Sequence, residues 1–281
     1  MLIPYTLEPP HAVGDHGDVV SCAQDNLHDE DDNEEAVGPN VWARVDLAKT
    51  IGEVMHLYRA LYPEHLATVQ TQTPTVLQEK LRQPNFIGLV RQFLSDQLQT
   101  DPDHPPAQLP ELPEQISVHP SAVATFYAPS DICGVNGMRR ERIRAVPSWR
   151  RGLGRYDCIF VNADPLAEGM RGLEVARVRS FFSFKSCGVT YPCALVHWYS
   201  RVGDEPDPAT GMWIVERDIN PDGLPSAAVI HLDSIVRAAH LLGVCGNDFV
   251  PKKLSHDASL DAFHAYYVNK YIDHHAFEIA F

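Results

Sequence analysis

The residues with the clearest potential for chemistry are arginines clustered near the middle of the chain. Residues 139–155 contain seven arginines and a single acid, Glu141, which gives this stretch a local charge of +6. Guanidinium groups make charge-assisted, often two-pronged hydrogen bonds with phosphates, and a neighbouring aromatic ring can stack on an unpaired base. The pattern therefore predicts contact with nucleic acid. The candidate residues are Arg139, Arg140, Arg142, Arg144, Trp149, Arg150, Arg151 and Arg155.

Two other interpretations of this cluster remain open. It could bind a protein surface, or it could be a solvated segment whose arginines pair with nearby acids such as Asp157, Asp164 and Glu174. Binding to DNA would carry a measurable signature. A patch that neutralises about five phosphates gives a log–log salt slope of about −4 to −5.

The net charge of −14 is concentrated at the N-terminus. Residues 1–40 hold ten acidic and no basic side chains, so the remaining 241 residues carry only −4. Like charges at the density of residues 25–35 (DNLHDEDDNEE) oppose compaction, and we expect residues 1–40 to form a disordered acidic arm. One hypothesis is that this arm folds back onto the arginine cluster in place of nucleic acid. The alternative is an ordinary solubilising tail.

Other residues that could support catalysis or bind a cofactor do not form a recognisable site. The six cysteines lack the close spacing of a structural zinc site, so reduced and mostly buried thiols are expected. The acidic loop 203–211 (GDEPDPATG) lacks the calcium-loop pattern and is expected to connect a hairpin. Packing or helix-end roles are expected for His264, His274 and His275. Phosphate-binding and nucleophile motifs are also missing, which predicts no cofactor, no metal, no small-molecule substrate and no catalysis.

Two helices and a linker are predicted in the first part of the chain. Apolar residues at helical spacing indicate a helix over residues 47–62, within a pattern that starts at Val41 and ends at Pro63. The six prolines of residues 101–120 predict a linker after this helical segment of residues 41–100. The second helix is predicted over residues 85–98, with Asn85 as its N-cap and an apolar face of Phe86, Val90, Phe93, Leu94 and Leu98.

From residue 121 the pattern changes to short β-rich runs. Residues 173–184 and 191–200 are expected to form a hairpin, in which Trp198 joins Val196 in the core and His197 lies on the opposite face. The expected fold class is α+β: a small antiparallel SH3-like or BAH-like β-barrel over residues 121–281 with flanking helices, plus the disordered acidic arm. Further strands are predicted at 122–128, 156–161, 212–216 and 228–232, and helices at 232–242 and 258–274.

Long ordered runs of the sequence resemble the C-terminal region of Plavaka-type transposases, which are fungal relatives of the CACTA and KDZ elements. The likeness is dense from about residue 117 to the end and thinner over residues 84–116. In that family an upstream RNase H-like domain with a D-D-E triad cleaves DNA. The matching runs lie outside that domain, so the resemblance assigns no catalytic residue to this chain. The runs are FYAPSD (126–131), GMRRERIRAVPSWR (137–150), RYDCIFV (155–161), EGMRGLEVARV (168–178), YPCALVHWYSRVGDEPD (191–207) and VNKYIDHHAFEIAF (268–281).

The resemblance and the arginine cluster together lead to an expected accessory role without catalysis. The chain would contact DNA or a transposase-type partner chain, and a protein-interaction module or a decayed element remnant without activity are the alternatives. The sequence has no run of about 18 apolar residues and no secretory signal pattern. We therefore expect no membrane partner and an intracellular, nuclear location.

Overall fold

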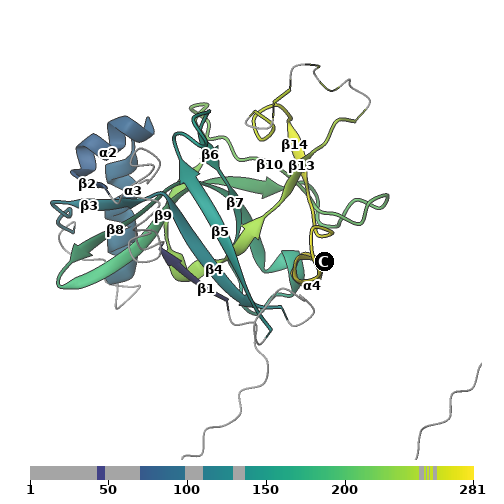
Figure 1. Cartoon of the computed structure of the whole chain (residues 1–281), viewed down its shortest axis with the longest axis horizontal. Helices are drawn as coiled ribbons and strands as arrows, with labels where there is room; N and C mark the ends of the chain where they lie inside the picture. The colour runs from purple at the N-terminus through teal and green to yellow at the C-terminus, as the bar shows by residue number, and fades with distance from the viewer. Residues whose placement is uncertain are drawn as a thin grey trace, which may run out of the picture. The chain divides into compact units, whose positions relative to one another are not determined.

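The fold is built mainly of antiparallel sheet with few helices (Figure 1), which confirms the α+β expectation at that level. The computed structural model describes residues 43–47, 70–98, 110–128, 137–246, 250, 252, 254–255 and 258–281, all within one compact unit, Pro39–Phe281. The predicted acidic arm 1–40, residues 48–62 of the first predicted helix and the prolines before residue 110 lie outside the described residues.

A four-stranded sheet carries the arginine cluster. Its strands follow the order β1-β4-β5-β6, and the three pairings are antiparallel. One face is apolar because alternate residues such as Val45, Ala124 and Ile143 point into the core, and the other face is polar. The strands are β1 (Ala43–Leu47), β4 (Ser121–Tyr127), β5 (Met138–Val146) and β6 (Arg155–Tyr156).

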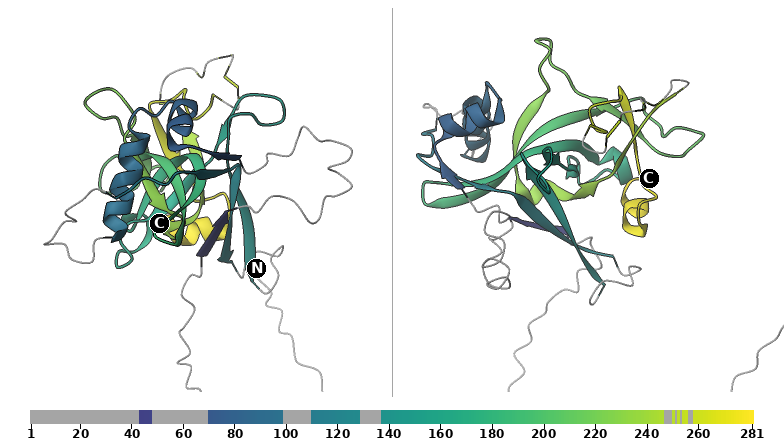
Figure 2. Two further views of the ribbon diagram at one scale, coloured as in Figure 1. Left: turned by 90° about the vertical axis from the view of Figure 1, so that its left-hand side faces the viewer. Right: turned by 45° about the horizontal axis from the view of Figure 1, so that its top comes forward.

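A ten-stranded sheet is organised around the predicted hairpin, β8 (Leu173–Ser186) and β9 (Val189–Arg201). Each long strand pairs with different neighbours along its length: β8 with β7 and β3, and β9 with β11 and β10. The sheet curls, as the two views of Figure 2 show. The other strands are β2 (Gln70–Gln72), β3 (Ile116–His119), β7 (Cys158–Asn162), β10 (Ile214–Arg217), β11 (Ala227–His231), β12 (Ile235–Ala239), β13 (Leu241–Gly243) and β14 (Ala265–Val268).

One extra residue interrupts the regular pairing of β8 with β9. Val178 lies opposite Val196 and Ser180 lies opposite Leu195, so Arg179 forms a β-bulge. The bulge reverses the alternation of β8. Arg177 before it and Phe182 after it consequently lie on the same face of the sheet, although their numbers differ by an odd amount.

Two helices cover one face of the hairpin. α3 (Phe86–Leu98) has the predicted bounds, and the predicted face is buried except for Leu98, which is 41% exposed. The helix preceding it, α2 (Pro74–Leu81), was not predicted; its N-cap Thr73 accepts a hydrogen bond from the Val76 N–H, and Pro74 fits the first turn. Both helices pack on a core that includes Phe182 and Leu195, so they belong to the same unit as the sheets.

Four expected segments differ in the structure. Residues 43–47 form β1 instead of starting a helix, and β3 lies within the expected linker 101–120. Residues 232–242 form a short 3-10 turn, β12 and the start of β13, because Ile235 and Ala239 pair with β7 instead of closing a helical turn. Residues 258–274 form turns and β14, and only α4 (His274–Ile279) is helical near the end of the chain. In each case partners distant in sequence override the local pattern.

The curled sheets enclose apolar cores instead of a channel. One core lies between β1, β4 and β5 on one side and β7, β8, β9 and β12 on the other, and it includes Phe126, Val178 and Val196. Trp198 packs against it, as predicted, while His197 on the opposite face lies 3.3 Å from the side-chain oxygen of Gln83. Another core, around Trp213 and Tyr266, supports the C-terminal strands.

Candidate nucleic-acid interface

Strand alternation divides the predicted arginine cluster into two groups. Arg140, Arg142 and Arg144 project from the outer, polar face of β5, and the first two are exposed. Arg139 and Glu141 project from the inner face toward β12 and the start of α4. The structure therefore brings the three even-numbered arginines together and separates Arg139 from them.

The outer face gains one arginine that the sequence did not suggest. Arg44 of β1 and Arg140 of β5 both lie opposite Thr125 of β4, so they share one row across the sheet. Arg44 pairs with Asp46 on the same strand (Nη2–Oδ1 3.0 Å) and is largely exposed. Arg44 was missed because residues 43–47 were expected to be helical. With the arginines of β5, this row forms a surface that we call the basic face: Arg44, Arg140, Arg142 and Arg144.

The loop 147–154 between β5 and β6 gathers the rest of the cluster around an indole ring. The Arg144, Arg150 and Arg155 guanidinium carbons lie 4.6, 5.7 and 5.7 Å from the centre of the Trp149 ring. Each distance falls within the range of a cation–π interaction. The predicted stacking of Trp149 on a base therefore competes with arginines that already occupy the neighbourhood of its ring.

The backbone of this loop holds the arginines at its tip. The Trp149 N–H donates to the Leu153 carbonyl (3.0 Å), and the Gly152 N–H donates to the Trp149 carbonyl (2.9 Å). Arg150 and Arg151 adopt φ values of 51° and 65°, in the left-handed region that non-glycine residues rarely occupy. Both side chains are exposed. The tight turn thus directs two adjacent cations outward from the end of the hairpin.

Asp157 is the acid that the structure places within the cluster. Its Oδ1 atom pairs with Arg155 Nε at 2.7 Å, and its Oδ2 atom accepts the Arg144 backbone N–H at 2.9 Å. The interpretation of structural pairing therefore holds for Arg155. Asp164, another acid that was considered, accepts the Leu166 N–H within its own turn. Burial lowers the pKa of Arg144, and the neighbouring guanidinium groups lower it further against the effect of Asp157.

A cavity of about 780 Å³ adjoins the loop. Trp149, Tyr156 and Leu260 supply its apolar walls, and Arg150 and Arg155 supply exposed cations. Arg177 also lines it, but this side chain is buried and its Nη1 atom pairs with Asp261 (2.7 Å). Aromatic walls beside cations suit a ligand that carries an anionic group.

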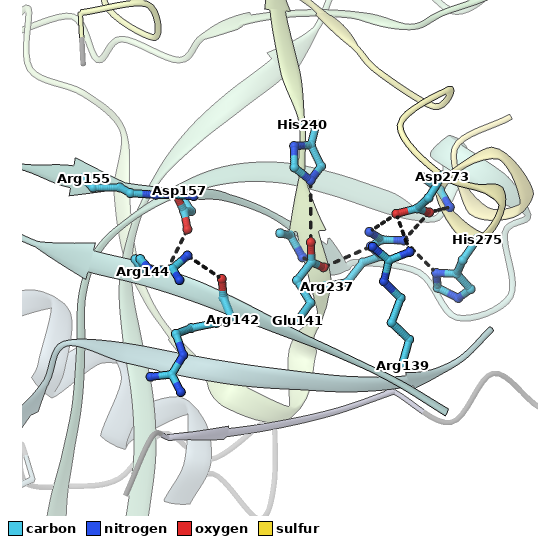
Figure 3. A network of polar contacts seen from close by, with 12 residues as sticks. Arg139, Glu141, Arg142, Arg144, Arg155, Asp157, Arg237, His240, Asp273 and His275 are labelled. Atoms are coloured by element: carbon cyan, nitrogen blue, oxygen red, sulfur yellow. Dashed lines mark hydrogen bonds and ion pairs between the residues drawn. The ribbon is translucent and has the colours of Figure 1, made fainter. Parts of the chain in front are cut away.

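On the inner face, Arg139 and Glu141 belong to a buried polar network (Figure 3). Its centre is Arg237 of β12, whose side chain is 0% exposed. Arg237 donates to both carboxylate oxygens of Asp273, at 2.8 and 2.7 Å, and its Nε atom lies 3.4 Å from Glu141. Arg139 approaches Asp273 at 3.5 Å. This arrangement joins β5, β12 and α4, which indicates a structural role for Arg139.

The remaining groups of this network adjust to the Arg237 charge. His275 accepts a hydrogen bond from Arg237 at Nδ1 (3.2 Å) and stacks on Phe126, with ring centroids 4.5 Å apart. Burial and the Arg237 charge lower the pKa of His275 to about 4, so its ring is neutral near pH 7. Burial alone would raise the pKa of Asp273, but the hydrogen bonds from Arg237 and Ala276 outweigh it and lower the pKa to about 2.

His264 has neither the packing role nor the helix-end role that was expected, because it precedes β14 instead of lying on a helix and its side chain is 90% exposed. Other sites considered from the sequence have structural roles where they are described. Loop 202–213 joins the antiparallel strands β9 and β10, which confirms that the acidic residues 203–211 connect a hairpin. His275 packs in the buried network, and His274 pairs with Glu278 one turn along α4. Across the part of the chain that the structure describes, no group of three or more His, Cys, Asp or Glu residues could hold a metal ion. Cys158, Cys187, Cys193 and Cys245 are free thiols.

None of the helices in the described ranges combines the length and the apolar character needed to cross a membrane. Comparison with known proteins gives no further identification. No family model, no curated protein and no solved structure matches this chain.

Proposed function

We propose that this chain is a non-catalytic accessory module that contacts the phosphate backbone of DNA through the basic face and the tip of loop 147–154. The observation that carries the proposal is the clustering of Arg44, Arg140, Arg142 and Arg144 on one sheet face, where the neighbouring acids among the described residues, Asp46 and Asp157, are fewer than the arginines. Arg150 and Arg151 add two exposed cations at the end of the adjoining hairpin.

The spacing of these cations suits a backbone contact. Alternate residues of an extended strand lie about 7 Å apart, so the β5 arginines form an evenly spaced row. Guanidinium groups in such a row can each contact a phosphate, and these contacts give affinity and orientation but no direct reading of the base sequence. We therefore propose binding that depends strongly on salt and weakly on sequence.

The resemblance to Plavaka-type transposases gives the proposal its setting. In that setting the module would act in the nucleus, beside a separate catalytic domain or a transposase-type partner chain, without cleaving DNA itself. We also propose that the curled sheets correspond to the SH3-like or BAH-like barrel expected for that region. The pairing of β12 with β7, together with the packing of β12 on β1, β4 and β5, supports a barrel-like closure.

The test is the salt dependence of binding to a DNA duplex. We expect the wild-type chain to show a steep log–log slope, and the double variant Arg140→Ala/Arg142→Ala to weaken binding and reduce the slope by about two. The matched control is Arg82→Ala/Arg91→Ala, which removes two exposed arginines near and within the helices. The proposal would be contradicted if the wild-type chain had no measurable affinity for DNA. It would also be contradicted if the control variant reduced the salt slope as much as Arg140→Ala/Arg142→Ala does.

A second candidate, a surface for a second copy of this chain, is favoured by exposed apolar side chains around α4. Tyr271 and Phe277 contact each other with ring centroids 5.9 Å apart, and both are exposed. Ile272 and Phe281 are exposed nearby in sequence. Apolar groups gathered in this way are typical of protein contact sites.

This second candidate is tested by the oligomeric state in sedimentation experiments. We expect a dimer that Phe277→Asp converts to a monomer. Leu166→Asp is the control, because Leu166 is an isolated apolar side chain that is 92% exposed. A monomeric wild-type chain would remove this candidate and leave the DNA proposal unaffected.

A further inference from the structure

A second large cavity also borders the β5–β6 hairpin and shares Leu153 and Tyr156 with the first one. Its volume is about 990 Å³, at the upper end of the range for sites that hold small molecules. Its lining includes residues of α2 and the following loop, the ends of β3 and β5, and loop 147–154. Leu77, Val118 and Val146 are among its apolar lining residues.

The bulge residue Arg179 supplies a half-buried cation to this cavity, whose lining also includes the exposed side chains of Lys80 and Arg82. A bulge inserts a side chain that regular alternation would place elsewhere, and such irregularities are frequent beside binding sites. The guanidinium carbon of Arg179 lies 4.3 Å from the centre of the Tyr156 ring, and both residues line the cavity. The ring thus holds the cation against one wall.

Arg179 differs from its neighbour Arg177 in having no acidic partner among the residues that the structure describes. Arg177 pairs with Asp261 at 2.7 Å, whereas within the described residues no carboxylate lies within 4.0 Å of Arg179. Burial and the charge of Arg177 lower the pKa of Arg179, with opposition from Tyr156 and Asp261. A half-buried cation without a counter-charge is costly, and an anionic ligand would offset that cost.

Two polar groups in the cavity wall add directional preference. Gln72 lines the cavity, and its buried side-chain oxygen has no hydrogen-bond partner in the described part of the chain, which leaves an acceptor for a ligand donor. His197 lines the cavity and lies 3.3 Å from Gln83. Burial and the nearby Arg179 lower the pKa of His197 to about 4, so its ring is neutral near pH 7.

We propose that this cavity binds a small organic anion, with its carboxylate or phosphate group on Arg179 and its apolar body against Leu77, Val118 and Val146. The anion supplies the charge that Arg179 lacks, and the body fills a space too large for the surrounding side chains to close. The site is separate from the basic face and does not depend on the DNA proposal.

Fluorescence titration of the full chain with two matched probes tests this site. The dye 8-anilinonaphthalene-1-sulfonate carries an anionic group on an aromatic body, and N-phenyl-1-naphthylamine is its counterpart without the charge. We expect Arg179→Gln to lower the affinity for the anionic dye about tenfold, as for loss of a charge-assisted hydrogen bond. The affinity for the neutral dye should change by no more than about twofold. Arg179→Lys should retain most of the affinity for the anionic dye. Competition by decanoate and by phenyl phosphate then distinguishes the two anionic groups.

A second variant pair protects the test if Arg179→Gln does not fold. Leu153 lines the cavity from the loop and is 71% exposed, so substitutions there leave the core intact. Leu153→Glu should lower the affinity for the anionic dye several-fold more than Leu153→Gln does, because the glutamate adds a charge that repels the dye. Arg91→Gln removes an exposed arginine of α3 that does not line the cavity, and it should change the affinity for neither dye by more than about twofold. The proposal would be overturned if Arg179→Gln lowered the affinity for both dyes equally. It would also be overturned if the two Leu153 variants bound the anionic dye with equal affinity.

Discussion

Arg237 and Asp273 form a two-point ion pair that fastens the N-terminus of α4 to β12, with N–O distances of 2.8 and 2.7 Å. Asp273 is also the N-cap of α4 and accepts the Ala276 N–H. One carboxylate thus satisfies a fully buried cation and begins a helix. The two functions can be separated by substitution.

Asp273→Ala should lower the free energy of unfolding by about 3–5 kcal/mol, because it leaves the buried Arg237 without its main counter-charge. Asp273→Asn should also destabilise, but by less, since asparagine is an equally good N-cap. Urea unfolding measures both changes. The control is Asp46→Ala, which breaks the exposed Arg44–Asp46 pair and should cost about 1 kcal/mol or less. Equal losses for Asp273→Ala and Asp46→Ala would refute a central role for the buried pair.

The same network predicts how stability depends on pH. Burial lowers the pKa of His275 from 6.5 to about 4, so between these values the unfolded chain binds a proton that the folded chain does not. The contribution of neutral His275 to the free energy of unfolding is fully present above about pH 6.5. It falls as the pH drops toward 4, by at most about 1.4 kcal/mol per pH unit. Protonation would place a second cation 3.2 Å from Arg237.

Urea unfolding at a series of pH values checks this expectation. His275→Gln should be less stable at pH 7 and should show a smaller decline between pH 6.5 and 4. His264→Gln should keep the wild-type decline, because the His264 side chain is 90% exposed. Below about pH 3.8 a further loss is expected, since the pKa of Asp273 is lowered to about 2 in the folded chain. A wild-type stability that stays constant from pH 6.5 to 4 would contradict the neutral state of buried His275.

The sequence predicted those elements whose pattern is local. The β8–β9 hairpin and α3 follow from alternation and from helical spacing, and both were confirmed. β12 was mistaken for a helix because Ile235, Ala239 and Leu242 also fit helical spacing. The residue that distinguishes the two is Arg237, whose burial depends on Asp273, a partner 36 positions away.

The candidate site was predictable in composition but not in arrangement. Seven arginines in a short stretch were visible in the sequence, yet only the strand assignment of β5 separates Arg139 from Arg140. Arg179 was overlooked because it stands in a regular-looking strand. The adjacent pair Phe181 and Phe182, which breaks the alternation of apolar residues, was the available signal for the bulge beside it.

The turn of the β8–β9 hairpin offers a stabilising substitution. Cys187 and Gly188 have φ values of 49° and 79°, so both central residues lie in the left-handed region that a two-residue type I′ turn requires. Asparagine tolerates this region better than cysteine, and Cys187 is exposed. We expect Cys187→Asn to raise the free energy of unfolding by about 0.5–1 kcal/mol in urea unfolding. Gly188→Ala is the opposite control and should lower it by about 1 kcal/mol; a destabilised Cys187→Asn variant would argue against this turn.

Trp149 tests how the basic cluster would meet nucleic acid. Three guanidinium groups lie within 6 Å of the centre of its ring, so we expect the indole to orient Arg144, Arg150 and Arg155 instead of stacking on a base. Trp149→Leu should therefore lower the affinity for single-stranded DNA and for duplex DNA by a similar factor of about two to five. This is the size of a cation–π contribution at an exposed site. Trp149→Phe, which keeps an aromatic face, should lose less. Anisotropy titrations with both forms of DNA give the comparison, and a loss confined to single strands would show that the ring stacks on bases after all.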